Sequence, residues 1–337
     1  MEDRMREELV APLQHLPPVD FCCAYGSALL PNRQKKTTIM VDYILGVSDP
    51  LQWHSENLEK NRQHYASWMA YLGPKVVTQV ADKIGVGVHF NPFVDLGEKG
   101  MIKYGVVRMH DLVQDILNWE RLYVCGRLQK PVCFLLDNSD IEKLNSLNLR
   151  AAISAALLLL PPKFTEEDLY AKVCSLSYNG DLRMFFAEDK NKVRKIVEGH
   201  FDSFRSMYRP FMDEYSTKGL LKLSSTADRR AVISQDSGLS STVLLISCLP
   251  KRIRIKMGMD TRPESETQLK SKECGKLINQ VVVKERRDAA KCLEKVLKRI
   301  VMESSARQAV SGLLAVGGLN AVRYLASKME KAWKSRE

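Results

Sequence analysis

A glycine-serine turn and a carboxylate about a dozen residues later are the first features of this chain that could do chemistry. A short apolar run leads into Tyr25, Gly26 and Ser27, the pattern of a buried strand that ends in a turn. Gly26 lets the backbone approach a ligand closely, and Ser27 adds a hydroxyl and a backbone N–H that suit phosphate oxygens. A second apolar run, residues 37–47, holds one charge, Asp42. Because a buried carboxylate is costly unless it is paired or holds a metal ion, these residues predict phosphate and metal binding.

The order of strand, glycine-serine turn and second strand with a carboxylate resembles the triphosphate and metal site of the nucleotidyltransferase superfamily, the DNA polymerase β-like enzymes. Two ordinary strands joined by a loop, with Asp42 solvated, would give the same pattern. The superfamily usually has two acids one residue apart on the second strand, whereas this chain has Met40 and Asp42 at those positions. The second metal ligand is therefore open among Glu98, Asp111, Asp115 and Asp181.

Other charged residues could act on phosphates. Lys103 is the charge inside an apolar segment and could reach a phosphate, or extend its ammonium into water from a strand end. Arg127 and Lys130 flank a turn led by glycine, where they could clamp a phosphate or belong to a solvated basic loop. We expect Asp181 and Arg183 to form a salt bridge that fixes the second part of the chain, in preference to a direct role in catalysis.

The composition is that of an ordinary globular protein with a basic surface. The chain has 337 residues, 45% of them hydrophobic and 27% charged, and a formal net charge of +11. This charge favours an anionic partner: a nucleotide, a nucleic acid or an anionic membrane surface. The six histidines and eight cysteines form none of the spacings typical of zinc sites. We expect no spanning segment, no secretory signal and no organelle presequence.

Secondary-structure patterns predict an α+β protein in three parts. Strands and helices mix in residues 1–138, which we interpret as a catalytic domain with a mixed sheet. Helical patterns dominate residues 139–250, and residues 251–337 combine a polar linker with a basic helical tail. Links between the strands of the first part are short, so we expect antiparallel pairing.

Four local segments give more specific expectations. Thr165 precedes three acids and is expected to cap a helix N-terminus. Residues 176–186 could form a hairpin or a turn into a strand, and residues 216–240 are polar enough to be an insertion or linker. Residues 242–248 are apolar and predict a strand.

The C-terminal segment is the most basic part of the chain. Residues 281–337 hold thirteen lysines and arginines against six acids, which is +7 of the net charge. Apolar residues there fall on one stripe at helical spacing, with basic residues elsewhere. We predict that this helix contacts an anionic membrane surface through Leu314, Val322, Arg323, Leu325, Lys331, Trp333 and Lys334. A terminal helix packed against its own domain is the alternative.

Several longer phrases together resemble one family, the mitochondrial phosphatidate cytidylyltransferases. They are Tyr25-Gly26-Ser27, Met40-Val41-Asp42-Tyr43, Asn61-x-x-His64-Tyr65, Leu72-Gly73-Pro74-Lys75, Gly126-Arg127-Leu128-Gln129-Lys130-Pro131-Val132 and Leu176-Ser177-Tyr178-x-Gly180-Asp181-x-Arg183. The likeness is dense from about Phe21 to Val193 and thin beyond Pro210.

The resemblance implies a Mg²⁺-dependent enzyme that converts CTP and phosphatidate to CDP-diacylglycerol and pyrophosphate on the way to cardiolipin. It implies a nucleotidyltransferase domain, a winged-helix-like domain and an amphipathic C-terminal segment, in a peripheral protein on the matrix side of the inner mitochondrial membrane. Asp42, Ser27 and Lys103 would be catalytic and Asp42 would hold the metal. Tyr25, Gly26 and Ser27 would bind the nucleotide, while Arg127 and Lys130 would bind the lipid phosphate.

Two other functions explain part of the pattern. A nucleotidyltransferase that acts on RNA or a small metabolite would also need the glycine-serine turn and Asp42. An RNA enzyme would need an extended basic groove with stacking aromatics, yet aromatics make up 7% of the chain, so we expect no nucleic-acid partner. A non-catalytic, membrane-associated scaffold that maintains protein import would explain the missing first acid.

Overall fold

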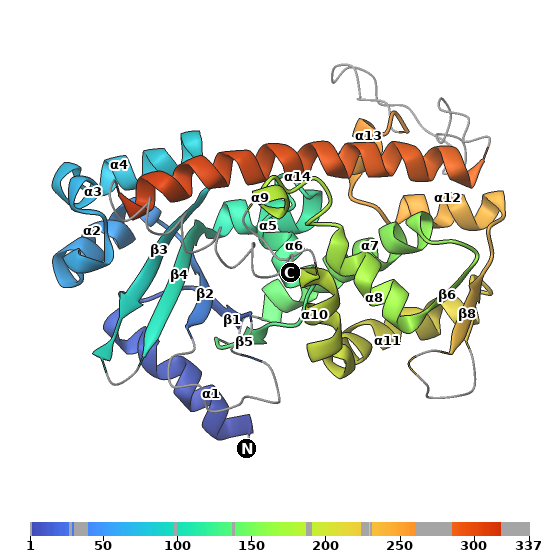
Figure 1. Cartoon of the computed structure of the whole chain (residues 1–337), viewed down its shortest axis with the longest axis horizontal. Helices are drawn as coiled ribbons and strands as arrows, with labels where there is room; N and C mark the ends of the chain where they lie inside the picture. Colours follow the sequence, from blue (N-terminus) through green and yellow to red (C-terminus); the bar gives the residue numbers. More distant parts are fainter. Residues whose placement is uncertain are drawn as a thin grey trace, which may run out of the picture.

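The protein is described here by a computed structural model. It describes residues 2–26, 29, 40–97, 100–136, 139–186, 191–223, 229, 231–259 and 285–317. A five-stranded sheet lies at one end of the molecule, helices with a small second sheet lie at the other, and one long helix runs along both (Figure 1).

The larger sheet is mixed, with the strand order β3-β4-β2-β1-β5. Its strands are β1 (Phe21–Tyr25), β2 (Val41–Val47), β3 (Val88–Asp95), β4 (Met101–Arg108) and β5 (Cys133–Phe134). β1 pairs antiparallel with β2 and β5, and β3 with β4, as the short links predicted. β2 and β4 pair in parallel, which the sequence pattern did not indicate. A crossover through helices separates these two strands in sequence, as parallel pairing requires.

Short helices connect and cover the sheet. They are α1 (Glu2–Val10), the 3₁₀ turn η1 (Ala11–His15), α2 (Pro50–Lys60), the 3₁₀ turn η3 (Arg62–His64), α3 (Ser67–Leu72), α4 (Pro74–Gln79) and the π-helical turn η4 (Val80–Ile84). α2 begins at Pro50, because the Asp49 side chain accepts hydrogen bonds from the backbone N–H groups of Leu51 and Gln52.

After β4 the chain is mainly helical. Its helices are α5 (Met109–Asn118), α6 (Val124–Leu128), α7 (Ser139–Leu159), α8 (Glu166–Ser175), α9 (Arg183–Phe186), α10 (Lys192–Gly199), α11 (Phe201–Thr217), α12 (Leu239–Ser247) and α13 (Lys251–Lys256). A three-stranded antiparallel sheet in the order β6-β8-β7 joins them, with β6 at Lys163–Thr165, β7 at Leu221–Lys222 and β8 at Val232–Gln235. The capping box predicted at Thr165 is present at the start of α8.

Three local expectations need correction. The apolar segment 242–248 lies in helix α12 and is no strand; five to eight apolar residues fit a buried helix as well as a strand. Residues 176–182 form a turn that leads into the short helix α9, so no strand forms in that described part. Segment 216–240 is more than a linker, since it contains β7 and β8.

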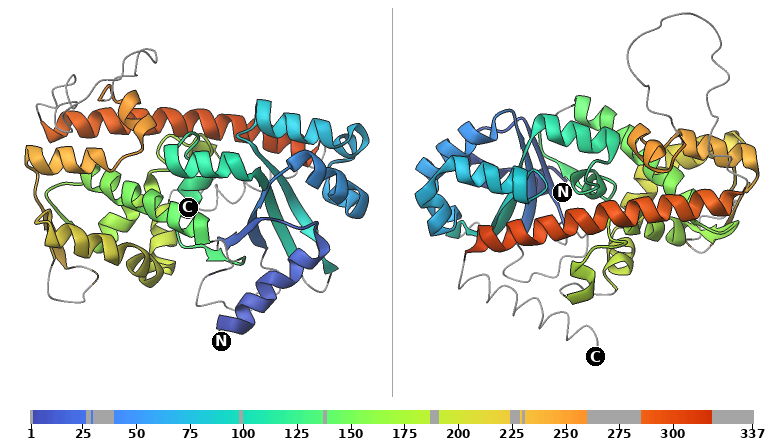
Figure 2. Two further views of the ribbon diagram at one scale, coloured as in Figure 1. Left: turned by 180° about the vertical axis from the view of Figure 1, so that it is seen from behind. Right: turned by 90° about the horizontal axis from the view of Figure 1, so that it is seen from above.

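Helix α14 (Arg286–Val316) is the longest element and spans the molecule from the helical end to the sheet (Figures 1 and 2). Its buried side chains recur every three or four residues and form one stripe: Ala289, Leu293, Leu297, Ile300, Val301, Ser304, Ser305, Gln308, Ser311 and Ala315. It contacts α7, α12 and α13 at one end and β3 and η4 at the other. The part of the predicted tail that lies in α14 is therefore packed on the protein.

The largest hydrophobic core is continuous from the sheet into the helical part. It joins Phe21 and Ile44 of the sheet to Ile153 of α7 and Leu293 of α14. Two smaller clusters lie on the other sheet face and under α3 and α4. The domain limits at 138 and 250 remain predictions. In the part of the chain that the structure describes, no helix has the length and apolar character needed to cross a bilayer.

Candidate active site

The turn after β1 and the carboxylate of Asp42 meet at one end of the larger sheet. Asp42 is the register partner of Tyr25, the last residue of β1. Gly26 follows with φ +92°, a conformation that favours glycine, and a Cβ placed there would lie 3.1 Å from Asp42 Oδ2. The turn backbone therefore lies against the carboxylate. Ser27, the other predicted nucleotide-binding residue, lies outside the described residues.

The parallel pairing of β2 and β4 places Lys103 beside Asp42. The two residues are register partners, and Lys103 Nζ lies 3.6 Å from Asp42 Oδ1. The same ammonium lies 4.8 Å from the ring centroid of Phe90. The side chains of Lys103 and Asp42 are 27% and 23% exposed, so both remain reachable from solvent. Two predicted catalytic residues that are 61 positions apart in sequence thus form one ion pair.

Arg127 of α6 adds a second cation at this edge. Its guanidinium carbon lies 4.3 Å from the ring centroid of Tyr25, a cation–π contact. Burial raises the pKa of the Tyr25 hydroxyl well above its usual value, and the charge of Asp42 adds to the rise. Tyr25 is therefore neutral and offers its ring face to the guanidinium. This contact places a planar donor group that suits phosphate oxygens next to the Gly26 turn.

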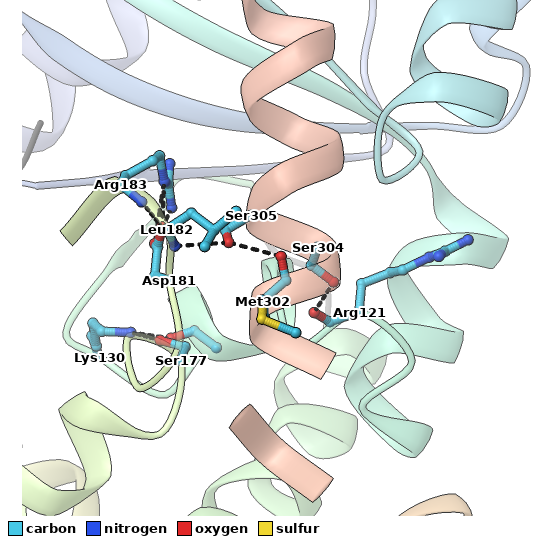
Figure 3. Close-up of polar contacts among 10 residues, drawn as sticks. Arg121, Lys130, Ser177, Asp181, Leu182, Arg183, Met302, Ser304 and Ser305 are labelled. Carbon is cyan, nitrogen blue, oxygen red and sulfur yellow. Dashed lines mark hydrogen bonds and ion pairs between the residues drawn. The ribbon is translucent and has the colours of Figure 1, made fainter. Parts of the chain in front are cut away.

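Lys130 is buried, at 4% exposed, and its ammonium donates to the backbone carbonyl of Gly126 and to Ser177 Oγ, the latter at 2.7 Å. Burial lowers the pKa of the Lys130 ammonium. The side chain joins α6 to the turn before α9 (Figure 3). Of the two residues predicted to bind the lipid phosphate, Arg127 lies at the site edge, whereas Lys130 is already committed to these two acceptors.

The salt bridge expected between Asp181 and Arg183 is present (Figure 3). Arg183 Nη2 lies 2.6 Å from Asp181 Oδ2, and the Asp181 side chain is 1% exposed. The Arg183 guanidinium also lies 6.0 Å from the ring centroid of Tyr123. The pair therefore links the turn before α9 to the loop before α6.

Asp115 has a role that the sequence did not reveal. Its two carboxylate oxygens accept hydrogen bonds from the five consecutive backbone N–H groups of residues 121–125, at 2.7 to 3.2 Å. The loop that these bonds hold includes Trp119 and Leu122, both with positive φ, which is costly for side chains of this size. Asp115 thus stabilises the strained loop that precedes α6.

The carboxylates named as second metal ligands are engaged elsewhere or lie outside the described residues. Asp115 binds backbone N–H groups, Asp181 binds Arg183, and Asp111 lies 2.9 Å from Arg108. Glu98 lies outside the described residues. Within the described ranges no three carboxylate, histidine or cysteine side chains cluster as a metal site. Asp42 still fits Mg²⁺, because this ion is commonly held by one or two carboxylates, waters and substrate phosphates.

A buried polar network fixes the opposite face of the sheet. The Tyr104 hydroxyl of β4 contacts Asn57 Nδ2, His64 Nδ1 and Asn91 Nδ2, each at 2.8 Å. The Tyr65 hydroxyl in turn contacts His54 Nδ1 and Asn57 Nδ2, also at 2.8 Å. These side chains are 9% exposed or less. They orient α2 on the sheet, with His54 and His64 as packing and hydrogen-bonding groups.

Comparison with known proteins identifies the family. Residues 9–331 match the family described as mitochondrial phosphatidate cytidylyltransferase. Relatives named mitochondrial phosphatidate cytidylyltransferase are 33% identical in Danio rerio, 34% in Bos taurus and 32% in Schizosaccharomyces pombe. The alignments cover 94, 96 and 99% of this chain and 92, 93 and 86% of those relatives. The chain belongs to this family.

One of the predicted membrane residues lies in the described part of the chain. Leu314 of α14 is half-buried and packs against the cluster under α3 and α4, and its carbonyl accepts a hydrogen bond from Trp68 Nε1 at 3.1 Å. Leu314 therefore packs on the protein itself, and the prediction that it contacts a membrane is not retained. Val322, Arg323, Leu325, Lys331, Trp333 and Lys334 lie outside the described residues.

Three side chains near the site were missed in the sequence. The charges of Arg127 and Lys192 act on the Tyr178 hydroxyl, and those of Arg183 and Arg127 act on the Tyr123 hydroxyl. Tyr178 stands inside one of the family phrases, but nothing in its local pattern indicated a role. Lys192 sits in an ordinary basic helix start. Only the contact between α6 and the turn before α9 brings them to the site.

Proposed function

We propose that this chain transfers the cytidylyl group of CTP to phosphatidate and so forms CDP-diacylglycerol and pyrophosphate. The observation that carries the proposal is the single site formed by the Gly26 turn, Asp42 and Lys103 in a chain that belongs to the phosphatidate cytidylyltransferase family. A carboxylate, a close-approach glycine and cations are what a nucleotidyl transfer needs.

In the proposed reaction a phosphate oxygen of phosphatidate attacks the α-phosphorus of CTP. The new P–O bond forms as the bond between the α-phosphorus and the bridging oxygen breaks, and pyrophosphate leaves with the electron pair. A phosphomonoester has a second pKa of about 6, so it is already mostly dianionic near neutral pH. The attack therefore needs no general base, and the protein's task is to align the groups and neutralise their charge.

Each site residue then has a proposed task. The backbone of the Gly26 turn would bind the triphosphate. Asp42 would hold Mg²⁺, which would screen the phosphate charges when bound. Lys103 would orient Asp42 through the 3.6 Å ion pair and add positive charge beside the triphosphate. Arg127, held over the Tyr25 ring, would bind a phosphate oxygen next to the turn.

The same proposal includes a place in the cell. The relatives carry the word mitochondrial in their names, and we propose a peripheral enzyme on the matrix side of the inner membrane that feeds cardiolipin synthesis. The basic residues of the C-terminal segment support attachment to anionic lipid. We further propose that residues 139–250, which combine helices with the β6-β8-β7 sheet, form the winged-helix-like domain.

The test is turnover by the purified protein with phosphatidate in anionic vesicles, Mg²⁺ and each of the four nucleoside triphosphates in turn. We expect CDP-diacylglycerol and pyrophosphate with CTP. Asp42→Asn should lower the rate by about a hundredfold or more, the usual scale for losing one charge-stabilising group. The matched control is Asp140→Asn, since that side chain is 86% exposed at the start of α7.

Other outcomes would point elsewhere. A product with another nucleotide, or none with phosphatidate but transfer to RNA or a small metabolite, would contradict the lipid assignment. Vesicle binding by folded protein without any product would favour the import-maintenance scaffold. Full activity in Asp42→Asn would contradict the assigned metal and catalytic role of this residue.

A further inference from the structure

The turn before α9 packs directly against α6, the helix that carries Arg127. A Cβ placed on Gly126 would lie 2.5 Å from Ser177 Cβ, so only glycine permits this approach. Lys130 Nζ bonds to Ser177 Oγ across the same contact. The residue after Ser177 is thereby held in a fixed position beside Arg127.

That residue, Tyr178, is buried and surrounded by cations. It is 7% exposed, and among the described residues its hydroxyl has no hydrogen-bond partner. Lys130 Nζ lies 4.9 Å and Lys192 Nζ 5.1 Å from its ring centroid. Burial of the hydroxyl acts to raise its pKa, but the charges of Arg127, Lys192 and Lys130 outweigh burial and lower it. A buried donor without a partner, facing positive charge, suits an anion.

Repulsion among the cations around Tyr178 also favours a bound anion. Burial lowers the pKa of the Lys130 ammonium, and the charges of Arg127 and Lys192 add to the decrease, so the three cations repel one another. Bringing Arg127, Lys130 and Lys192 around a neutral ring costs repulsion energy that a bound anion would relieve. Protein sites that gather cations in this way commonly bind phosphate groups.

We infer that Tyr178 and Lys192 of the helical part, together with Arg127, form the site for the phosphate group of phosphatidate. This inference rests on the proposed function and adds two residues to it. The Tyr178 hydroxyl donates to one phosphate oxygen, and Lys192 and Arg127 neutralise the dianion. Lys130 is a positioning residue, since its ammonium holds Ser177 and does not reach the ligand.

The position of the cluster favours the lipid phosphate over the triphosphate of CTP. Arg127 interacts with Tyr25 and Asp42 at the Gly26 turn, which is proposed for the triphosphate, and with Tyr178, which comes from the separate segment before α9. In an in-line attack the incoming phosphate and the leaving pyrophosphate lie on opposite sides of the α-phosphorus. Arg127, which interacts with both groups, would bridge the two substrates.

The first test separates the two substrates kinetically. Initial rates of Tyr178→Phe and Lys192→Gln are measured with phosphatidate varied at saturating CTP, and then with CTP varied at saturating phosphatidate. We expect KM for phosphatidate to rise about ten- to a hundredfold, the scale of one lost hydrogen bond to a charged group, while KM for CTP stays within about twofold. Lys195→Gln is the matched control, because Lys195 is an exposed lysine on the same helix.

The second test reads binding without turnover. Calorimetric titration with soluble short-chain phosphatidate should show binding to the wild-type chain and to Lys195→Gln, and about tenfold weaker binding to Lys192→Gln and Tyr178→Phe. Phosphatidylcholine of the same chain length serves as the ligand control. Thermal unfolding of each variant reports whether it is folded.

The outcomes separate this inference from the proposed function. If the wild-type chain makes no CDP-diacylglycerol, the proposed function is wrong, whatever the variants do. If wild-type turnover is normal and both KM values are unchanged in the two variants, the inference is wrong and the function stands. If KM rises for CTP and not for phosphatidate, the cluster binds the triphosphate and the assignment to the lipid phosphate is overturned.

Discussion

At the scale of single residues, carboxylates of similar appearance in the sequence have different tasks. Asp42 is partly exposed beside one lysine and the Gly26 turn, so its carboxylate remains reachable from solvent. Asp115 is 5% exposed and has both oxygens occupied by backbone N–H groups, so it is a structural residue. Exposure and the kind of hydrogen-bond donor distinguish the two roles.

Replacement of Asp115 by asparagine tests its structural role. The amide nitrogen would face backbone N–H groups, leaving donors opposite donors in a buried place. We expect Asp115→Asn to lower the free energy of unfolding by about 3 kcal/mol or more, as measured by urea denaturation. Asp111→Asn is the control, because its ion pair with Arg108 is 37% exposed and should contribute under about 1 kcal/mol. Equal effects of the two changes would contradict the assignment.

At the scale of elements, α14 determines where two site loops lie. Ser304 Oγ donates to the carbonyl of Arg121 at 2.7 Å, and Ser305 Oγ accepts from the backbone N–H of Leu182 at 3.1 Å (Figure 3). Arg121 precedes Tyr123 and α6, and Leu182 lies between Asp181 and Arg183. A buried pair of hydroxyls on one helix turn thus fixes both loops that border the proposed phosphate site.

Removing these hydroxyls should affect the site without abolishing the fold. We expect Ser304→Ala and Ser305→Ala each to lower the free energy of unfolding by about 1–2 kcal/mol, because each leaves a partly buried backbone group without its partner. We also expect both to reduce kcat/KM for phosphatidate, measured by CDP-diacylglycerol formation. Glu303→Ala, an exposed change on the same turn, is the control. Unchanged turnover in the double variant would show that α14 does not position the loops.

The buried histidines between α2 and the sheet predict an acid-sensitive core. Burial lowers the pKa of His64 and of His89 to about 4, and that of His54 well below its usual value. Between pH 6.5 and pH 4 the unfolded chain takes up protons that the folded chain does not, so stability falls as the pH falls through this window. We expect a loss of about 2 kcal/mol or more between pH 7 and pH 4.5, measured by urea denaturation.

A pair of variants checks the source of this acid sensitivity. In His64→Asn the side-chain amide can keep the hydrogen bond to Tyr104 without a titrating ring, so the pH dependence should become shallower. The exposed His110→Asn should leave it unchanged. A pH dependence that is the same in both variants would contradict a contribution from His64.

At the scale of the whole molecule, one continuous core and one long helix hold the sheet part and the helical part together. α14 packs on β3 and η4 at one end and on α7 and α12 at the other. Arg307 reinforces the first contact, since its guanidinium donates to the backbone carbonyls of residues 82–85. Arg286 reinforces the second contact, since its guanidinium donates to the backbone carbonyls of Leu157 and Asp236.

This arrangement decides which truncation can test membrane binding. Removal of residues 304–337 would delete the part of α14 that packs on the sheet, so it would damage the fold. We expect the chain of residues 1–317 to unfold within a few degrees of the full chain. We also expect it to sediment far less with anionic vesicles, because it keeps only one of the seven predicted membrane residues, Leu314, which is packed on the protein. Retained vesicle binding would place the membrane contact elsewhere.

Several parts of the candidate site were predictable from the sequence because they are local. A strand followed by glycine, a carboxylate in an apolar strand and the helix cap at Thr165 are determined by neighbouring residues. The long family phrases, from Gly126 to Val132 among them, were specific enough to indicate the enzyme family. These features needed no knowledge of which elements touch.

Tertiary structure decided what depends on elements far apart in the chain. Parallel pairing of β2 with β4 brings Lys103 to Asp42, and the contact of Gly126 with Ser177 brings Tyr178 and Lys192 to Arg127. The buried stripe of α14 shows as a helical pattern in the sequence, but a bilayer and a protein surface bury such a stripe equally well. Only the packing partners show that residues 286–316 belong to the protein's own core. The hydrophobic effect is non-directional, so an apolar stripe in the sequence does not specify the surface that covers it.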